Sequence, residues 1–308
     1  MQANREAYGE ALVDLYQTHK NLVVLDADLA KATYTDIFRQ KHPDRFVDCG
    51  IAEQNMMTTA AGLAAAGLLP FVSTFAVFAS LRASEQFRNS ICYPQLNVKV
   101  VATHGGIECG ADGATHQALE DVAVMRSIPG SVVVVPSDPV STKALVAAIA
   151  DYQGPCYMRV GREKVNEIYD AKAQFKIGGS NKLKEGGKAA ILATGDRVQA
   201  SLNAAKALEE KGVSVSVYDM YSIKPIDEEA IKEAAKTGLI FTVEDHETVG
   251  GLGSAVCEVV CQNAPCKVVR MGVANNFGRS GSSADLFKFY KLDEEAIVNT
   301  VLNQINSK

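Results

Sequence analysis

Short apolar segments that alternate with helical segments constrain the fold of this chain more than any other feature. Residues 22–25 are wholly apolar, follow a helix expected over residues 3–18, and end in the acidic turn Asp26-Ala27-Asp28. Apolar runs of this length, each followed by a helix, are typical of parallel strands buried on both faces. The same alternation continues, with expected strands at 46–48, 70–74, 98–103, 132–135 and 156–159 and expected helices at 52–66, 76–91, 119–127 and 140–151. The sequence therefore predicts an α/β fold with a doubly wound, mostly parallel sheet.

A second unit of the same kind follows a polar stretch. Between Gly161 and Gly187 the apolar pattern fades and glycine pairs appear, which is typical of a linker. Beyond it, strands are expected at 189–193, 214–219, 239–243 and 267–271, and helices at 198–211, 227–237, 251–262 and 294–305. We expect domains at 1–160 and 188–308, joined by a linker at 161–187, with the second domain smaller than the first.

Composition excludes several classes of protein. A content of 47% hydrophobic and 22% charged residues is that of a globular protein, and a net charge of -5 without arginine-rich runs argues against nucleic acid as a partner. The first residues lack the apolar core of a signal peptide, and no uninterrupted apolar stretch approaches 18 residues. Cys257, Cys261 and Cys266 are closely spaced but lack a fourth ligand. We expect a cytoplasmic protein with reduced thiols, no membrane contact and no metal held by its own residues.

One carboxylate opens a helix made otherwise of small and apolar residues. Glu53 lies in the segment Gly50-Ile51-Ala52-Glu53-Gln54-Asn55-Met56. An acidic residue here can simply favour the positive end of the helix dipole. A carboxyl group desolvated by alanine and glycine would instead have a raised pKa and could share a proton with a heterocycle. The local pattern leaves both interpretations open.

Three apolar side chains follow the strand expected at 70–74 on one helical face. Phe75, Phe78 and Leu81 are spaced three residues apart. Such a stripe most often packs in a core. Against a bound planar ring, however, aromatic stacking contributes about 0.5 to 1.5 kcal/mol beyond area burial.

The most specific segment is the glycine-rich loop at residues 103–117. It reads THGGIECGADGATHQ and carries two histidines and two acidic residues directly after a strand. Glycines let the backbone turn sharply beside a ligand, and His104, Asp112 and His116 supply hydrogen-bonding groups for a polyhydroxylated substrate. The histidine spacing matches no zinc pattern, so we expect hydrogen bonding to hydroxyls.

Together, these segments in this order resemble the transketolase family. GIAEQNM is similar to the motif whose glutamate contacts the aminopyrimidine of thiamine diphosphate, STFAVF to the pyrimidine pocket, and THGGIECGADGATHQALEDVAVMRSIPG to the substrate loop. The similarity covers nearly the whole chain, including the linker, the EDHETVGGLG segment and the last domain. It implies a thiamine diphosphate pyrimidine-binding domain followed by a transketolase C-terminal domain.

The resemblance also implies roles around the cofactor. Glu53 would hydrogen-bond to the pyrimidine ring and promote the imino tautomer, which takes the proton from the thiazolium carbon. Phe75 and Phe78 would hold the ring, together with Leu81, which replaces an aromatic residue common in the family. Asp28 would lie beside the cofactor and substrate channel.

Substrate contacts follow in the same way. His116 and Asp112 would meet the carbonyl and first hydroxyls of a ketose whose two-carbon ketol unit is transferred to an aldose. His104, Arg159 and Arg5 match positions that hold the sugar phosphate, and arginine offers a bidentate fork to such groups. Where the family often has a phosphate-binding serine, the chain reads Ala30-Lys31-Ala32-Thr33. A sulfonated sugar, or a phosphate held partly by Lys31 or Thr33, therefore stays open.

The glycine-aspartate-glycine signature with its downstream asparagine, which holds magnesium and diphosphate in this class, is not found in the sequence. The resemblance therefore implies the C-terminal subunit of a split transketolase of the pentose phosphate pathway. An N-terminal subunit would hold the diphosphate and most of the Mg²⁺ or Ca²⁺ coordination, with sites at subunit interfaces in an A2B2 heterotetramer.

Four questions stay open from sequence. The chain could be the beta subunit of a 2-oxoacid dehydrogenase decarboxylase component, which lacks a loop of the GADGATHQ form. It could be part of a deoxyxylulose phosphate synthase, which shares that loop but not THGGI. A catalytically silent partner would be expected to lack Glu53 or His116, and both are present. The loop at residues 250–253 could bind an anion at a helix start or contact another subunit.

Overall fold

The first domain is built on a mostly parallel seven-stranded sheet. In the computed structural model, which describes residues 1–306, its strand order is β12-β6-β7-β5-β4-β2-β3. Every pairing in this sheet is parallel except that of β12 with β6. The strands are β2 (Leu22–Asp26), β3 (Phe46–Asp48), β4 (Leu69–Phe75), β5 (Lys99–Thr103), β6 (Val132–Val134), β7 (Cys156–Val160) and β12 (Ser222–Lys224).

Helices cover both faces of this sheet, as the apolar pattern predicts. Along β2, Val23 and Leu25 pack into one buried cluster, whereas Leu22 and Val24 pack into another on the opposite face. The helices are α1 (Asn4–Thr18), α2 (Ala30–Thr33), α3 (Asp36–Lys41), α4 (Glu53–Ala65), α5 (Ser84–Gln86), α6 (Asp121–Ser127) and α7 (Pro139–Asp151), with 3-10 turns η1 (Pro43–Arg45) and η4 (Ile107–Asp112). The doubly wound fold is therefore confirmed.

The helix expected at residues 76–91 is not one regular helix. It contains two π-helical segments, η2 (Phe78–Arg82) and η3 (Phe87–Cys92), on either side of α5. Because a π turn has wider spacing than an α turn, it changes which side chains share a face, and such turns are frequent at functional sites.

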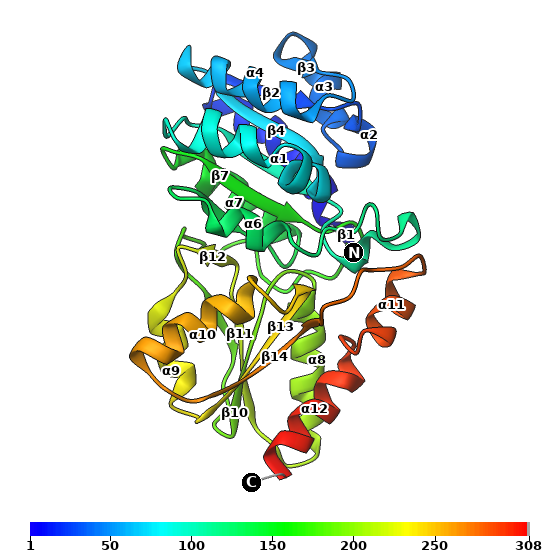
Figure 1. Cartoon of the computed structure of the whole chain (residues 1–308), viewed down its shortest axis with the longest axis vertical. Helices are drawn as coiled ribbons and strands as arrows, with labels where there is room; N and C mark the ends of the chain where they lie inside the picture. The colour runs from blue at the N-terminus through cyan, green and yellow to red at the C-terminus, as the bar shows by residue number, and fades with distance from the viewer. Residues whose placement is uncertain (307–308) are drawn as a thin grey trace.

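The second domain repeats the architecture with five strands. Its order is β14-β13-β10-β11-β9, and only β9 is antiparallel. In Figure 1 this domain lies below the first, with α9 and α10 on one side of the sheet and α8 and α12 on the other. Its elements are β9 (Asn181–Lys184), β10 (Ala189–Ala193), β11 (Val215–Asp219), β13 (Leu239–Glu247), β14 (Lys267–Val273), α8 (Arg197–Glu210), α9 (Glu228–Ala235), α10 (Leu252–Asn263), α11 (Ser283–Phe289) and α12 (Glu294–Asn306).

One strand from the second half of the chain belongs to the sheet of the first domain. β12 leaves the second domain and joins the edge of the first sheet, so residues 222–224 belong to the first sheet although the expected division placed them in the second domain. Near the linker, β1 (Gln2–Ala3) pairs with β8 (Lys164–Val165). Across residues 1–306, the helices are too short or too polar to traverse a lipid bilayer. The seven cysteines, all in this range, are free thiols.

A buried carboxyl group connects the two domains and the linker. Asp219, at the end of β11, accepts hydrogen bonds from Ser137 Oγ of the first domain (2.6 Å) and from the hydroxyl of Tyr169 in the linker (2.7 Å). Its other oxygen is buried without a hydrogen-bond partner among the described residues. Burial raises the pKa of Asp219 to about 7, against the hydrogen bonds that lower it.

We predict that Asp219→Asn changes the pH dependence of stability. Between the unfolded pKa of about 3.8 and the folded pKa of about 7, the folded state keeps a proton that the unfolded state loses. Stability from this group is thus present at low pH and is lost as pH rises, by up to about 1.4 kcal/mol per pH unit. In urea unfolding from pH 4 to 8, the stability of Asp219→Asn relative to wild type should increase up to about pH 7 and then level off. With exposed Asp151→Asn as the control, a flat difference curve for Asp219→Asn contradicts the assignment.

Candidate functional site

The candidate site lies at the carboxyl edge of the first sheet. β2, β4 and β5 are adjacent and parallel, with Asp26 opposite Ser73 and Phe75 opposite Thr103. Because parallel strands end at one edge, the loops that follow them converge there. The sheet thus brings together the aromatic residues after β4 and the glycine-rich loop after β5.

Four rings form an aromatic row at this edge. His104 lies over Phe75 with ring centroids 3.9 Å apart, and Phe75 stacks on Phe78 at 5.9 Å with an interplanar angle of 14°. His116 meets the two phenylalanines edge-on, at 6.3 and 5.5 Å. The structure therefore gathers four residues that the sequence assigns to the cofactor and the substrate. Leu81, which the sequence also assigns to the cofactor, has 49% of its surface exposed and does not close the site beside these rings.

His104 is held as a neutral imidazole. The side chain is buried, its Nδ1 lies 2.8 Å from Thr103 Oγ1, and its Nε2 lies 3.5 Å from Arg5 Nη1. Burial, reinforced by the positive charges of Arg5 and Arg162, lowers the pKa of His104 to about 3. At neutral pH this ring can donate or accept a hydrogen bond without a charge of its own.

Glu53 begins α4 and is 2% exposed, which is the buried environment of one of the two interpretations that the sequence left open. Its surroundings are not only alanine and glycine, however. Arg82 Nη1 donates to both carboxylate oxygens, at 2.9 and 2.8 Å, and the same guanidinium lies over the ring of Phe78 at 4.3 Å. Sequence analysis missed Arg82. The available signal was a cation four residues after an aromatic residue in a helical segment.

A second residue that sequence analysis missed is Arg162. Arg5 Nε donates to the Arg162 carbonyl at 3.0 Å and Arg5 Nη1 to the Ala32 carbonyl at 2.7 Å. Arg162 Nη1 in turn donates to the Cys109 carbonyl at 2.5 Å. Burial, together with the like charge of Arg162, lowers the pKa of Arg5. We name Arg5, neutral His104 and Arg162 the cationic cluster. The charges of both arginines lower the pKa of His104, Glu108 and Glu163 partly offset the repulsion at Arg5, and a bound anion would reduce it further.

Arg159 lies elsewhere, beneath the glycine-rich loop. Its Nε pairs with buried Asp121 at 3.2 Å, and its Nη2 donates to the Asp245 carbonyl at 2.6 Å. A Cβ added at Gly105 would overlap Arg159 Nε, so the loop can cross this guanidinium only with glycine there. Arg159 is 5% exposed, and these contacts hold the loop rather than face the cationic cluster.

Asp112 and His116 stand on the glycine-rich loop with most of their polar atoms free. Within residues 1–306, the exposed side chain of Asp112 accepts a hydrogen bond only from the thiol of Cys109, at 3.7 Å, while His116 Nδ1 lies 2.9 Å from Thr115 Oγ1. Positive φ values at Gly110 (76°) and Gly113 (77°) create the turns that carry them. Both side chains are available to hydroxyl groups of a ligand.

The turn after β2 has a different arrangement from that considered for a phosphate. Asp28 is exposed and lines a cavity of about 350 Å³ together with Lys31 and Arg39. Thr33, in contrast, is buried, and its hydroxyl donates to Asp26 at 2.8 Å. Of the two residues considered for phosphate, only Lys31 faces this cavity.

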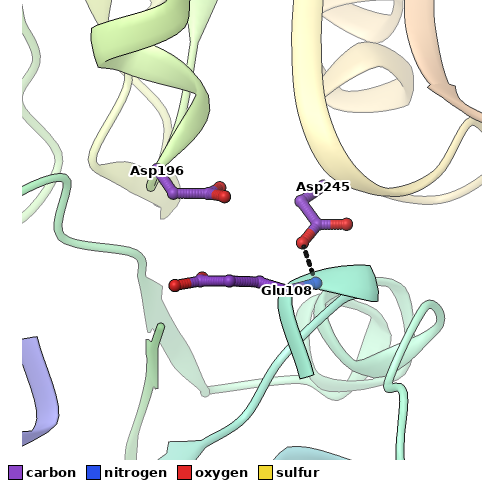
Figure 2. Close-up of side chains that lie close together, drawn as sticks. All are labelled: Glu108, Asp196 and Asp245. Carbon is purple, nitrogen blue, oxygen red and sulfur yellow. Dashed lines mark hydrogen bonds between the residues drawn. The ribbon is translucent and has the colours of Figure 1, made fainter. Parts of the chain in front are cut away.

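Three carboxyl groups lie close together between the domains, as Figure 2 shows for Glu108, Asp196 and Asp245. Their ligand atoms all lie within 4.8 Å of one another. Asp245 accepts hydrogen bonds from the amides of Ile107 and Glu108, at 2.9 and 3.0 Å. Burial and then neighbouring Asp196 raise the pKa of Asp245, to about 6, and that of Glu108. The amides of Ile107 and Glu108, together with the charges of Arg159 and Arg197, stabilise Asp245, so the cluster is an internal contact between the glycine-rich loop and the second domain.

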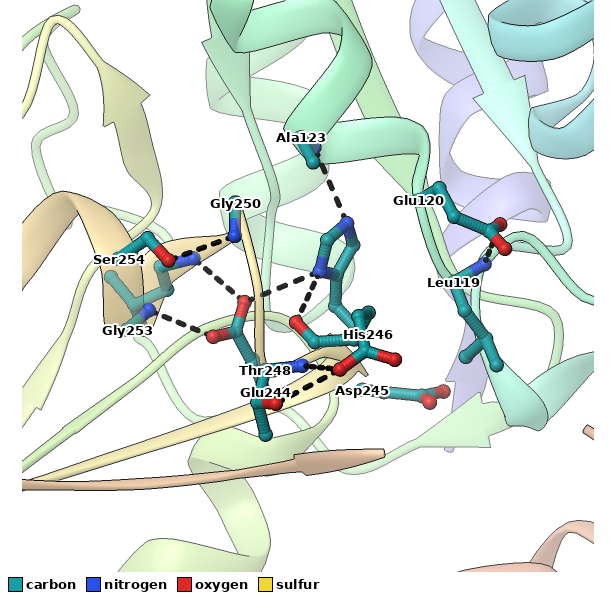
Figure 3. Close-up of polar contacts among 12 residues, drawn as sticks. Leu119, Glu120, Ala123, Glu244, Asp245, His246, Thr248, Gly250, Gly253 and Ser254 are labelled. Carbon is teal, nitrogen blue, oxygen red and sulfur yellow. Dashed lines mark hydrogen bonds and ion pairs between the residues drawn. The ribbon is translucent and has the colours of Figure 1, made fainter. Parts of the chain in front are cut away.

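The loop at residues 250–253 already has an anion of its own. Figure 3 shows the Glu244 carboxylate accepting from the Gly253 amide at 2.7 Å, at the start of α10. The Leu252 amide also donates to this carboxylate, at 2.7 Å. Beside it, His246 Nε2 accepts from the Ala123 amide of α6 at 3.3 Å, which links the domains. Two of the amides that we considered for an external anion are therefore occupied by Glu244, and the Gly250 amide donates to Ser254 Oγ at 2.8 Å.

Comparisons with known proteins match this arrangement over both domains. Residues 1–167 match the model of the transketolase pyrimidine binding domain, and residues 178–297 match that of the transketolase C-terminal domain. The chain is 46% identical over 307 residues to a putative transketolase C-terminal section of Methanocaldococcus jannaschii, covering 99% of this chain and 96% of the relative. This chain belongs to the transketolase family. It corresponds to the pyrimidine-binding and C-terminal domains of these thiamine diphosphate-dependent transferases.

Two further relatives are transketolase subunits that are named for different sugars. One is a 6-deoxy-6-sulfo-D-fructose transketolase subunit of a Clostridium species, 39% identical, with 96% of this chain and 92% of the relative covered. Another is one of the subunits of the apulose-4-phosphate transketolase of Phocaeicola vulgatus, 40% identical, with 98% and 97% covered. A solved split gene transketolase, an inactive beta4 tetramer, superimposes with a TM-score of 0.93 at 47% identity over 99% of each chain. The chain spans only 48% of human transketolase.

We predict that Arg159 and Arg162 differ sharply in their effect on stability. Arg159→Met leaves the buried Asp121 carboxylate without its cation, which typically costs about 3 to 5 kcal/mol. Arg162→Met removes a partly buried side chain that is not paired with a buried carboxylate and should cost less than about 1 kcal/mol. Urea unfolding of the purified chain at pH 7 measures both. Equal losses for the two variants would show that Arg159 does not anchor the glycine-rich loop.

Proposed function

We propose that this chain is the C-terminal subunit of a transketolase that moves a two-carbon ketol unit from a ketose phosphate to an aldose phosphate. The observation that carries the proposal is the placement of Glu53. Its buried carboxylate pairs with Arg82, whose guanidinium lies over Phe78, and Phe78 in turn contacts Phe75 and His116 in the aromatic row. Of the alternatives from sequence, the matches over both domains favour this over a 2-oxoacid dehydrogenase component.

The residues present fit the aminopyrimidine half of thiamine diphosphate. A buried carboxylate offers the acceptor for a ring nitrogen, and Phe75 and Phe78 offer an apolar face on which a planar ring can stack. Asp28 and Leu81 would border the same space. When bound, thiamine diphosphate would supply the nucleophilic carbon that ketol transfer requires.

The diphosphate half of the site, with Mg²⁺ or Ca²⁺, would come from an N-terminal subunit in an A2B2 heterotetramer. The chain has no glycine-aspartate-glycine signature of its own for that group. Relatives of about the same length are named as a transketolase C-terminal section and as single subunits of a transketolase, and the solved split relative is inactive as a beta4 tetramer. These observations support a catalytic site completed by a second polypeptide.

Each of the chain's own site residues then has a separate role. Glu53 holds or gives up a proton at the pyrimidine nitrogen. His116 and Asp112 donate to and accept from the first hydroxyls and the carbonyl of the ketose. Neutral His104, with Arg5 and Arg162, receives the anionic end of the sugar, and Arg159 holds the glycine-rich loop so that these contacts coincide.

The terminal group of the substrate can be phosphate or sulfonate. The cationic cluster presents two arginines and a neutral donor, which suits any tetrahedral oxyanion. Relatives named for a sulfonated fructose and for apulose 4-phosphate are about equally similar, at 39% and 40% identity. We favour phosphate, because two guanidinium groups match its greater charge.

The proposal is tested by titrating thiamine diphosphate and Mg²⁺ into this chain alone and into its mixture with a candidate N-terminal subunit. Ketol transfer from a ketose phosphate should appear only in the mixture. Glu53→Gln should lower kcat in the mixture by roughly 100- to 10,000-fold, the typical range for general acid–base catalysis. Glu10→Gln, an exposed carboxylate paired with Lys143, is the control and should keep full activity. Turnover by the isolated chain, or an active Glu53→Gln mixture, contradicts the proposal.

We further predict that Arg162→Gln weakens recognition of the anionic end. Losing a charge-assisted hydrogen bond of about 1.5 to 3 kcal/mol should raise KM for fructose 6-phosphate by about 10- to 100-fold with little change in kcat. Exposed Arg88→Gln serves as the control. The matched substrate 6-deoxy-6-sulfo-D-fructose, compared by kcat/KM, decides between phosphate and sulfonate. A loss in kcat at constant KM would exclude Arg162 from the anion site.

A further inference from the structure

We propose that Arg82 occupies the place of the aminopyrimidine in the free chain and must be displaced when the cofactor binds. This inference rests on the proposed function and deepens it, because it assigns an autoinhibitory role to a residue that neither the sequence motifs nor the comparisons single out. In the free chain, Arg82 already makes the two contacts expected of the pyrimidine.

The first contact is with the catalytic carboxylate. A single nitrogen of Arg82 lies 2.9 Å from Glu53 Oε1 and 2.8 Å from Oε2, so both acceptor atoms of Glu53 face the guanidinium. Glu53 is 2% exposed, and its carboxylate has no other hydrogen-bond partner among residues 1–306. A pyrimidine nitrogen can bond to this carboxylate only if Arg82 gives up at least one of these contacts.

The second contact is with the aromatic face. The guanidinium carbon of Arg82 lies 4.3 Å from the centroid of Phe78, whose ring is stacked on Phe75. A guanidinium is planar and donates hydrogen bonds in its plane, as does an aminopyrimidine in its N–H forms. The two groups therefore compete for the same carboxylate and the same ring.

Arg82 can also move away from Glu53 without a rearrangement of the buried core. Its side chain is 45% exposed, whereas the side chain of Glu53 is 2% exposed, so the arginine can swing into solvent while the carboxylate stays in place. Glu85, an exposed carboxylate three residues further along, offers another partner in that direction. The segment that carries Arg82 is π-helical, closed by the bond from the Ala83 amide to the Phe78 carbonyl at 3.1 Å. A return to α-helical spacing would carry Arg82 around the helix axis and off the ring.

The consequence for cofactor binding is quantitative. A ligand that binds only the open state has an apparent Kd equal to the intrinsic Kd divided by the open fraction. If the closed state exceeds the open state by about tenfold, removing the Arg82 contacts tightens cofactor binding by up to about tenfold. A residue that merely supported Glu53 would have the opposite effect, because its loss would weaken binding.

We test this with Arg82→Met, which keeps an unbranched apolar stem, and with Arg82→Lys, which keeps the charge but loses the planar fork. In the complex with the N-terminal subunit and Mg²⁺, the Kd of thiamine diphosphate is measured by isothermal titration calorimetry. Arg82→Met should bind about 3- to 10-fold more tightly than wild type, and Arg82→Lys should lie between them. Arg88→Met, which replaces an exposed arginine in η3, should not change the Kd. Unchanged or weaker binding by Arg82→Met overturns the inference.

A second measurement uses the isolated chain and no cofactor. Urea unfolding of Arg82→Met, Glu53→Gln and the double variant forms a double-mutant cycle for the pair. The double variant should be no less stable than the worse single variant, because either substitution alone already breaks the pair. Fully additive losses show that the pair does not form in the free chain, and the inference then fails. Failure of the proposed function has a different signature, since the wild-type complex would then bind no thiamine diphosphate at all.

Discussion

The buried guanidinium of Arg159 is the interaction on which the rest of the site depends. It leaves the end of β7, pairs with Asp121 at the start of α6 and donates to the Asp245 carbonyl of β13. One side chain thereby joins the first sheet, a helix of the same domain and the second domain, directly beneath the glycine-rich loop. Because Arg159 and Asp121 are both buried, breaking the pair leaves an uncompensated charge, and this makes the arrangement cooperative.

The junction of the two domains is organised by the same electrostatic constraint. Glu108, Asp196 and Asp245 converge there, and Asp219 lies at the junction with the linker. Burial at these positions raises the pKa values of Asp219, Asp245 and Glu108. The hydrogen bonds that these carboxyl groups accept lower the pKa values again, but only in part. The glycine-rich loop is thus positioned by groups that respond to protonation, whereas the atoms it presents to a ligand, on Asp112 and His116, stay nearly free.

The sequence predicts those parts of this structure that depend on burial along one element. Strands such as β2 are recognisable because burial on both faces requires an uninterrupted apolar run. β12 was missed because three residues, one of them a lysine, carry no such pattern, and the π turns were missed because apolar periodicity does not reveal a change from four-residue to five-residue bonding. Arg159 and Arg162 follow one another so closely that residue type could not separate their roles. The strand expected at 156–159 already contained Arg159, and β7 is buried along its whole length, whereas Arg162 lies beyond its end at Val160.

The pairing of Glu53 with Arg82 joins residues 29 positions apart, and no local pattern encodes it. The sequence left open whether this carboxylate is desolvated or only favours the helix dipole, and a carboxylate at 2% exposure is not stable in isolation, because unpaired buried charge costs several kcal/mol. Something must therefore bond to Glu53 at all times, either a cation from the chain or a ligand that brings its own hydrogen-bond donor. This requirement links catalysis to selectivity: a ligand gains access to the carboxylate only if it replaces both the hydrogen bonds and the aromatic stacking that Arg82 provides. A heteroaromatic ring with a polar edge meets both conditions, and a flexible polar molecule meets only the first.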